Sequence, residues 1–137
     1  MNKTTTSVKI VKTELNKVKD NALLIGFFKD KLSLSSELKK LDKELNNIIG
    51  SYIKNNDFKG EKGETRSIFV NKNIKNIVLV GLGEQVNYNL NILSSIIADV
   101  SKKLRDNAIE SFSIYLNSFL NKRFKEDEAI KKITISS

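Results

Sequence analysis

The sequence predicts an α/β protein in which a mixed β-sheet lies between layers of helices, as in a three-layer sandwich. Two short apolar runs, Ala22 to Phe28 and Ile77 to Val80, have the length of strands that are buried on both faces. Two longer segments, Leu34 to Tyr52 and Leu90 to Leu104, carry apolar residues three and four positions apart, which is typical of amphipathic helices. Because such helices alternate with strands along 137 residues, we expect a single domain of this class.

The first half of the chain is expected to form two strands, a helix and a loop. Ser7 to Lys12 alternates weakly and fits an edge strand, whereas Gly26 inside the first apolar run indicates a close backbone approach or a bulge. The first amphipathic segment is predicted to begin after Ser33, a good N-cap, and to end at Asn55-Asn56-Asp57. The charged segment from Phe58 to Thr65 contains two glycines and is predicted to be a loop.

The second half is expected to add two strands around the second apolar run, a second long helix and a helical tail. Ser67 to Val70 fits a short strand, and Asn89 is placed to cap the helix that ends near Asp106-Asn107. In Ser111 to Leu116, apolar residues alternate with serine and tyrosine, which predicts a half-buried strand. The highly charged segment from Lys122 to Lys132 is predicted to start a helix.

The chain lacks both cysteine and histidine. It therefore has no thiolate ligands, no disulfides and none of the side chains that most often act as a general base near neutral pH. A metal site would need carboxylates alone, which favours magnesium, calcium or manganese over zinc. Composition thus argues against an enzyme.

The net charge of +8 and the isoelectric point of about 9.6 raise the question of a nucleic-acid partner. Arginine, the residue that binds phosphate in a forked geometry, occurs only at Arg66, Arg105 and Arg123, while lysine is spread throughout the chain. A solvated lysine-rich surface is therefore favoured over direct nucleic-acid binding. The longest apolar run is far below the ~20 residues of a membrane span, and Met1 to Ser7 lacks the apolar centre of a signal peptide, so we predict a cytoplasmic protein without a membrane partner.

The step Gly81-Leu82-Gly83 lies between an apolar strand and a helix. Such turns can bind phosphate through bare backbone N–H groups. The dinucleotide-binding pattern, however, needs a small residue where this chain has Val86, and no Walker lysine follows. A tight turn is therefore favoured, with a bound phosphate as the alternative.

Two acidic clusters are candidate functional sites. Glu61 and Glu64 could act as an acid–base pair if their environments separated their pKa values, but a solvated loop is the favoured interpretation. Glu126-Asp127-Glu128 lacks the spacing of a calcium loop and fits a charged helix face. No serine has a histidine partner, which excludes the usual serine nucleophile.

Four segments, in order and spacing, resemble the N-terminal domain of the leucyl (cytosol) aminopeptidase family. They are Leu24-Ile25-Gly26-Phe27-Phe28, Leu41-Asp42, Asp57-Phe58-Lys59-Gly60-Glu61-Lys62-Gly63-Glu64-Thr65 and Ile77-Val78-Leu79-Val80-Gly81-Leu82-Gly83. The resemblance covers nearly the whole chain and implies an α/β fold similar to macro domains.

The resemblance also implies what this chain leaves out. In the family, a separate C-terminal catalytic domain carries two divalent metal ions, expected to be manganese or zinc, with the ligating carboxylates and a catalytic lysine and arginine. No segment of residues 1–137 resembles those motifs, so no catalytic, cofactor-binding or metal-binding residue is assigned to this chain. The segment from Glu128 to Ser137 matches a helix that leads toward the catalytic domain. The chain is therefore expected to be an excised domain or a fragment, with Ile130, Ile133 and Ile135 lacking packing partners.

Three functions follow as expectations, in order of preference. The first is a structural and assembly module, whose partners are its own catalytic domain and the other subunits of a homohexamer that removes N-terminal residues from peptide substrates. The second is a macro-like binding module for a nucleotide near Gly81 to Gly83, or for nucleic acid. The third, a stand-alone enzyme, is disfavoured by the absence of histidine and cysteine.

Overall fold

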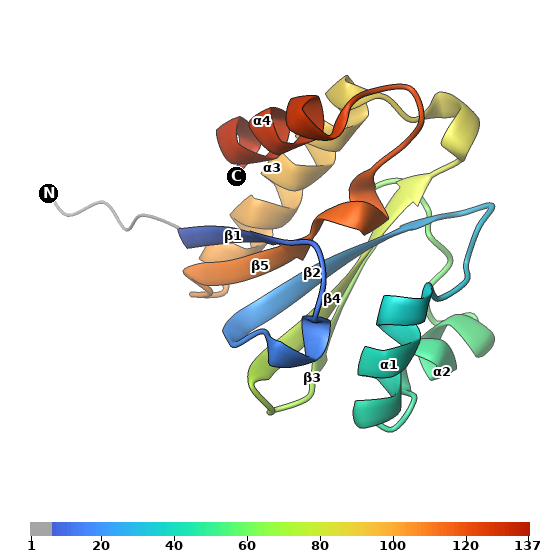
Figure 1. Cartoon of the computed structure of the whole chain (residues 1–137), viewed down its shortest axis with the longest axis vertical. Coiled ribbons are helices and arrows are strands. Elements are labelled where there is room, and N and C mark those ends of the chain that lie inside the picture. Colours follow the sequence, from blue (N-terminus) through green and yellow to red (C-terminus); the bar gives the residue numbers. More distant parts are fainter. Residues whose placement is uncertain (1–6) are drawn as a thin grey trace, which may run out of the picture.

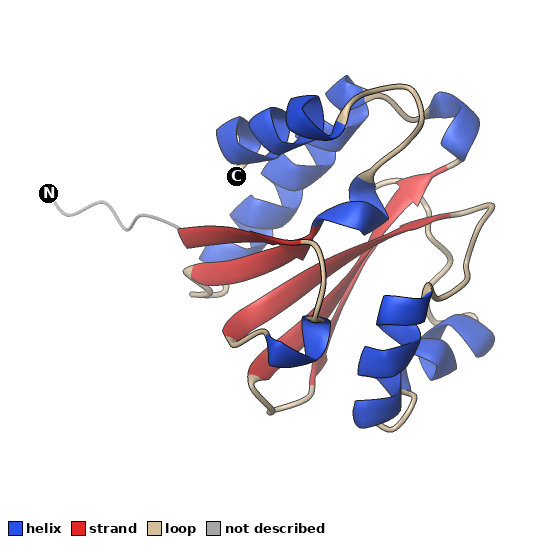
Figure 2. Ribbon diagram, in the orientation of Figure 1, coloured by secondary structure: helices blue, strands red, loops and turns tan. Residues whose placement is uncertain are grey.

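A computed structural model describes residues 7–137 and confirms the predicted α/β sandwich (Figures 1 and 2). The sheet has five strands in the order β1-β5-β2-β4-β3, and all neighbours are parallel except β3, which is antiparallel to β4. The strands are β1 (Ser7–Val11), β2 (Asp20–Phe28), β3 (Thr65–Phe69), β4 (Ile74–Gly83) and β5 (Ser111–Tyr115). The α-helices are α1 (Ser36–Glu44), α2 (Ile48–Lys54), α3 (Leu90–Asp106) and α4 (Glu126–Ser136). Residues 1–6 of the polar segment considered for a signal peptide lie outside the described residues.

The sheet separates two hydrophobic cores. Helices α1 and α2 cover one face, and α3 and α4 cover the other (Figure 1). Successive residues of β2 point to opposite faces: Leu23 and Ile25 pack in the core with α1 and α2, whereas Leu24 packs in the core with α3 and α4. This arrangement confirms that the first apolar run is a central strand buried on both faces.

The single helix predicted over residues 34–52 is wrong, because the chain breaks into α1 and α2. Asn46 and Asn47 adopt left-handed backbone conformations with φ of 58° and 61°. The buried carboxylate of Asp42 then accepts hydrogen bonds from the N–H groups of Ile49, at 2.7 Å, and of the next residue, at 3.0 Å. Asp42 therefore supplies acceptors for the start of α2, and the apolar stripe continues across the break.

The remaining boundaries mostly agree with the sequence. The N-cap of α1 is Ser35, which accepts a hydrogen bond from the Leu38 N–H, and not the predicted Ser33. Asn89 caps α3 as predicted, and β1 lies at an edge of the sheet. The charged tail becomes helical only at Glu126. No helix within residues 7–137 is both long enough and apolar enough to cross a membrane.

Strand β5 is more buried than its alternating pattern predicted. Ser113 is completely buried and Tyr115 is 3% exposed, because β5 lies between β1 and β2 and both of its faces are covered. The hydroxyls of Ser111 and Ser113 donate to the Asp20 carboxylate at 2.5 and 2.8 Å. Both serine hydroxyls are therefore hydrogen-bonded to Asp20 inside the fold. The prediction that this strand is half-buried is wrong.

The C-terminal helix packs better than expected. Ile133 is fully buried and Ile130 packs against the same core, so the expectation that they lack partners is wrong for both. Ile135 is 72% exposed and agrees with it. The hydroxyls of Ser94 in α3 and Ser136 in α4 also lie 2.6 Å apart, which joins the two helices near the end of the chain.

Candidate functional site

The Gly81–Gly83 step is engaged by the loop at residues 58–64. The Gly81 N–H donates to the Glu64 carbonyl at 2.7 Å, and the Gly83 N–H donates to the Gly60 carbonyl at 2.9 Å. A Cβ atom on Gly81 would lie only 1.9 Å from the Glu61 carbonyl oxygen, so only glycine allows this approach. The predicted tight turn is wrong, because Gly81 to Gly83 form the end of strand β4 (Ile74–Gly83) and pair with β2. The N–H donors of both glycines are used within the fold, which leaves neither of them for a phosphate.

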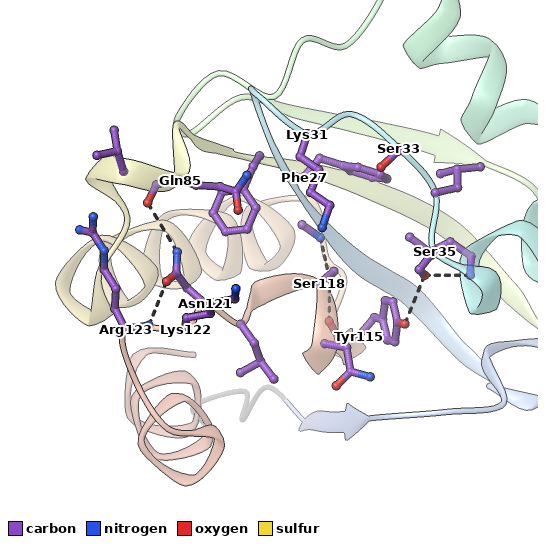
Figure 3. Close-up of a pocket in the computed structure, with 17 residues that line it drawn as sticks. Phe27, Lys31, Ser33, Ser35, Gln85, Tyr115, Ser118, Asn121, Lys122 and Arg123 are labelled. Atoms are coloured by element: carbon purple, nitrogen blue, oxygen red, sulfur yellow. Dashed lines mark hydrogen bonds between the residues drawn. The ribbon is translucent and has the colours of Figure 1, made fainter.

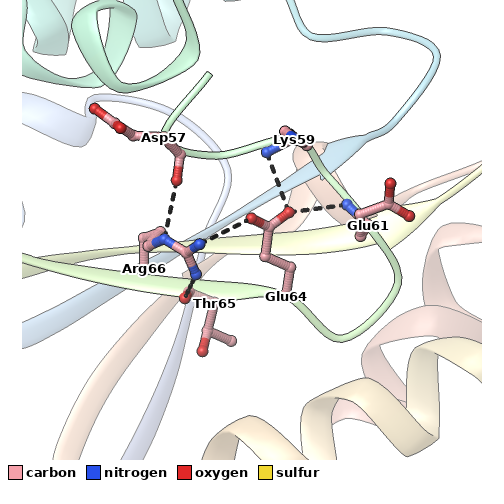
Figure 4. Close-up of polar contacts among 6 residues, drawn as sticks. All are labelled: Asp57, Lys59, Glu61, Glu64, Thr65 and Arg66. Carbon is pink, nitrogen blue, oxygen red and sulfur yellow. Dashed lines mark hydrogen bonds and ion pairs between the residues drawn. The ribbon is translucent and has the colours of Figure 1, made fainter. Parts of the chain in front are cut away.

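Glu64 holds this loop together (Figure 4). Its Oε1 atom accepts hydrogen bonds from the N–H groups of Lys59 and Glu61, both at 3.1 Å. Its Oε2 atom lies 3.3 Å from the Arg66 guanidinium, which also donates to the Asp57 carbonyl. The Glu64 carboxylate is therefore an internal acceptor that closes the loop.

Glu61 has a different partner. Its carboxylate lies 3.0 Å from the Lys29 ammonium, and both side chains are about half exposed. The hydrogen bond and negative charge of Glu61 raise the pKa of Lys29 above its usual value. Because Glu61 and Glu64 each bind a separate cation, they do not form the acid–base pair considered from the sequence.

The acidic cluster at the start of α4 is also engaged in the fold. Glu126 pairs with Lys12 at 2.5 Å, Asp127 accepts from the Glu128 N–H at 3.0 Å, and Glu128 accepts from the Lys125 N–H at 2.9 Å. Negative charge at a helix N-terminus is favourable in itself. Within residues 7–137, no group of three or more acidic side chains is placed to hold a metal ion. The described residues therefore do not fit a two-metal centre.

A cavity with a volume of about 870 Å³ lies at the carboxyl ends of β2 and β5 (Figure 3). It is bounded by the segment that follows β2, by the segment that follows β5, and by Gln85 and Val86 after β4. Its apolar wall contains Phe27, Leu34 and Leu120. None of the candidate functional residues from the sequence, the two acidic clusters and the Gly81–Gly83 step, lines this cavity. Gly26, for which the sequence predicted a close backbone approach or a bulge, does line it.

Gly26 connects the two sides of the cavity. Its N–H donates to the Ser118 hydroxyl at 2.8 Å, and that hydroxyl donates to the Tyr115 carbonyl at 2.7 Å (Figure 3). A Cβ atom on Gly26 would lie 2.9 Å from Leu82 and 3.0 Å from the Ser118 carbonyl. The predicted close approach at Gly26 is therefore confirmed, and it fixes the turn after β5 against the end of β2.

The charged side chains that line the cavity are all basic. They are Lys31, Lys122 and Arg123, and no carboxylate lines the cavity with them. None of the three forms an ion pair among the described residues. Sequence inspection missed this group because Lys31 lies about ninety residues from the other two. The general rule that parallel strands place their carboxyl ends at one edge of a sheet could have suggested that residues following different strands lie close together.

Comparison with known sequences identifies one family. The cytosol aminopeptidase family, N-terminal domain, matches residues 24–137. A protein described as a probable cytosol aminopeptidase from Alkaliphilus oremlandii is 30% identical over 98 residues, which cover 70% of this chain and 20% of that protein. A relative with the same description from a Sulfurihydrogenibium species is 26% identical over 129 residues, covering 93% of this chain and 25% of its own length. The chain thus spans about a fifth to a quarter of the length of these relatives.

Comparison with solved structures confirms the macro-like fold. A mutant of tomato leucine aminopeptidase superposes with a TM-score of 0.70 at 17% identity, covering all of this chain and 29% of that one. The macrodomain of Mycobacterium tuberculosis DarG also gives a TM-score of 0.70, at 10% identity, covering 96% of this chain and 90% of the macrodomain. At these identities the likeness extends to the fold alone.

Proposed function

The chain belongs to the cytosol aminopeptidase family as an N-terminal domain, and from this premise we propose that it is a non-catalytic structural and assembly module of a longer leucyl aminopeptidase. The longer protein would remove N-terminal residues from peptides in the cytoplasm. Its partners would be its own catalytic domain and the other subunits of a homohexamer. The match over residues 24–137 carries this proposal.

The arrangement of the carboxylates supports a non-catalytic role. Asp42 supports the start of α2, Asp20 binds two serines, Glu64 closes a loop and Glu128 caps α4. Each of these groups has a partner that holds the fold together. In the proposed parent, two divalent metal ions in the catalytic domain would activate water and polarise the scissile carbonyl, while this domain would contribute by packing.

The exposed apolar side chains suggest where packing partners would lie. Ile135 in the last turn of α4 is 72% exposed, and Phe69 on the edge strand β3 is 68% exposed. The end of α4 is where the family resemblance places the path to the catalytic domain. We therefore place the contact with that domain around Ile135.

Two measurements test this proposal. The first is to read the gene downstream of the codon for Ser137, where an open frame of several hundred codons with clustered Asp, Glu and Lys would support it and an immediate stop codon would contradict it. The second is hydrolysis of a leucyl amide by the purified 137-residue chain with added Mn²⁺ or Zn²⁺, using a complete relative as the positive control. Hydrolysis by this chain alone would refute the non-catalytic role.

A binding module is the second function to consider, because the fold carries a basic cavity at the carboxyl edge of its sheet. The Gly81–Gly83 step is a poor place for such a ligand, since the N–H groups of both glycines are already bonded. A ligand bound in the basic cavity, away from the Gly81–Gly83 step, would be compatible with an assembly role.

A further inference from the structure

Strand β3 forms one edge of the sheet, and among residues 7–137 it pairs only with β4, in the antiparallel direction (Figure 1). At one end of this pairing, the Gly81 N–H donates to the Glu64 carbonyl at 2.7 Å. At the other end, the Val70 N–H donates to the Lys75 carbonyl at 2.8 Å. The main-chain groups of successive residues in such a strand point alternately toward the neighbouring strand and away from it. The even-numbered residues of β3 therefore face β4.

The odd-numbered residues, Thr65, Ser67 and Phe69, turn their N–H and C=O groups to the outside of the sheet. The Thr65 carbonyl accepts a hydrogen bond from the Arg66 guanidinium at 2.8 Å (Figure 4), and a carbonyl oxygen has a lone pair for a second donor. Ser67 is exposed and Phe69 is 68% exposed. Edge strands are commonly protected by lysine or proline, and β3 contains neither. This edge is therefore open to a further strand.

A second copy of β3 fits this edge in an antiparallel register. If a twofold axis passes beside Ser67, the two Ser67 residues lie opposite each other, and Thr65 lies opposite the partner's Phe69. All three residues face outward, so each of these pairs is of the type that exchanges two main-chain hydrogen bonds. Pairs of an aromatic and a β-branched side chain are favourable in sheets. The strand is therefore self-complementary, as a twofold contact requires.

The charges along β3 are compatible with this register. Arg66 would lie opposite the partner's Ile68, so no like charges of the strand face each other directly. The opposite edge of the sheet differs, because Lys9 is the central residue of β1. Twofold pairing over the whole of β1 would place two lysines directly opposite, which is destabilising. Of the two edges, β3 is the one suited to a second copy.

We propose that two copies of this chain associate by antiparallel pairing of β3 with β3, centred on Ser67, which joins their sheets into one. Two five-residue strands bury less than the ~1,200–2,000 Å² of stable complexes, and each chain has a net charge of +8. The dimer is therefore weak, and salt strengthens it by screening the repulsion between the copies. This pairing goes beyond the proposed function and does not depend on it, since a stop codon after Ser137 would leave it unaffected.

The absence of cysteine makes the register directly testable. In an oxidising glutathione buffer, Ser67→Cys chains at millimolar concentration should form a disulfide-linked dimer, since Cα atoms of a hydrogen-bonded pair lie ~5.5 Å apart and disulfides span about 4.4–6.8 Å. Thr65→Cys chains alone should link no faster than the exposed control Ser95→Cys in α3, because their Cα atoms would lie roughly 14 Å apart. A mixture of Thr65→Cys and Phe69→Cys chains should give the mixed dimer.

Sedimentation equilibrium of cysteine-free chains gives a second measurement. Ser67→Pro removes the outward N–H that both copies use at the axis, without removing a bond to β4. It should weaken dimerisation about tenfold or more, because two hydrogen bonds are lost. The matched control Ser67→Ala keeps this N–H and should change dimerisation less than about twofold. Circular dichroism shows whether Ser67→Pro is folded, and the cysteine comparison tests the proposal in either case.

The proposal is overturned if Ser67→Cys links no faster than Ser95→Cys, or if Thr65→Cys links with itself as readily as Ser67→Cys. It is also overturned if a folded Ser67→Pro protein dimerises as well as Ser67→Ala, or if the unsubstituted chain stays monomeric at millimolar concentration in high salt.

Discussion

Replacing Gly81 by alanine is expected to destabilise the domain strongly. The new Cβ atom would lie 1.9 Å from the Glu61 carbonyl oxygen, a backbone atom, so the loop at residues 58–64 must move away. That movement would weaken or break three backbone N–H···O=C hydrogen bonds, in which the donor is named first: Gly81 to Glu64 at 2.7 Å, Gly83 to Gly60 at 2.9 Å, and Gly63 to Gly81 at 3.0 Å.

The size of the effect follows from these contacts. Overpacking costs about 1–3 kcal/mol, and each lost backbone hydrogen bond adds about 0.5–1.5 kcal/mol. Partial relaxation of the loop should leave a net loss of about 2–4 kcal/mol. At roughly 2 cal/mol/K of unfolding entropy per residue, this loss lowers the melting temperature of a domain of this size by about 7–14 °C.

The assay is thermal unfolding followed by circular dichroism, with Gly63→Ala as the matched control. Gly63 has a positive φ of 83°, which Gly81 does not have, and nothing lies within 4 Å of the position that a Cβ atom would take at residue 63. Its replacement should therefore cost only the left-handed strain of about 1–2 kcal/mol. A Gly81→Ala protein that melts no lower than Gly63→Ala would refute the argument that the contact with Glu61 requires glycine.

Four further substitutions test buried hydrogen bonds and packing. Asp42→Ala should lose about 2–4 kcal/mol in urea unfolding, because two N–H groups at the start of α2 lose their acceptors; a loss below that of an exposed aspartate would contradict this role. Burial raises the pKa of Tyr88, whose hydroxyl donates to the Phe119 carbonyl at 2.8 Å. Since the folded pKa exceeds the unfolded value of about 10, the stability from the protonated phenol is fully present below about pH 10 and is lost as the pH rises further. Tyr88→Phe should therefore cost about 1 kcal/mol near neutral pH and flatten the decline above pH 10, whereas an unchanged alkaline profile would exclude Tyr88 as its cause. Ile133→Ala should cost about 2–4 kcal/mol and Ile135→Ala less than about 0.5 kcal/mol, and equal losses would show that α4 does not pack as described.

The break between α1 and α2 shows where local pattern falls short. The apolar stripe runs through both helices, because both pack on the same core, and the periodicity alone therefore predicts one helix. Asn46 and Asn47 adopt the left-handed backbone conformation at the break, and the buried Asp42 carboxylate supports the start of α2. Asp42 lies on the same face of α1 as the apolar residues, so its role at the start of α2 does not change the spacing of those residues.

The candidate site depends even more on tertiary structure. Gly26 was identified from the sequence as a point of close approach, yet its partner Ser118 is 92 residues away. Lys31 and Arg123 line one cavity only because β2 and β5 are neighbours in the sheet, although β3 and β4 separate them along the chain. The order of the strands in the sheet is set by pairing between distant segments, so it cannot be inferred from any single segment of the sequence.

The α/β class, the main apolar strands, the capped helix α3 and the family resemblance could be inferred from the amino-acid sequence, because each depends on local period, local caps or a continuous motif. Which polar groups are hydrogen-bonded inside the fold, and which are not, became visible only in three dimensions. The fold bonds the N–H groups of Gly81 and Gly83 to the neighbouring loop and leaves Lys31, Lys122 and Arg123 around a cavity at the divergence of two connections. The physical reason is that hydrogen-bond satisfaction and charge pairing depend on distances in space, which a residue's own neighbours in sequence do not fix.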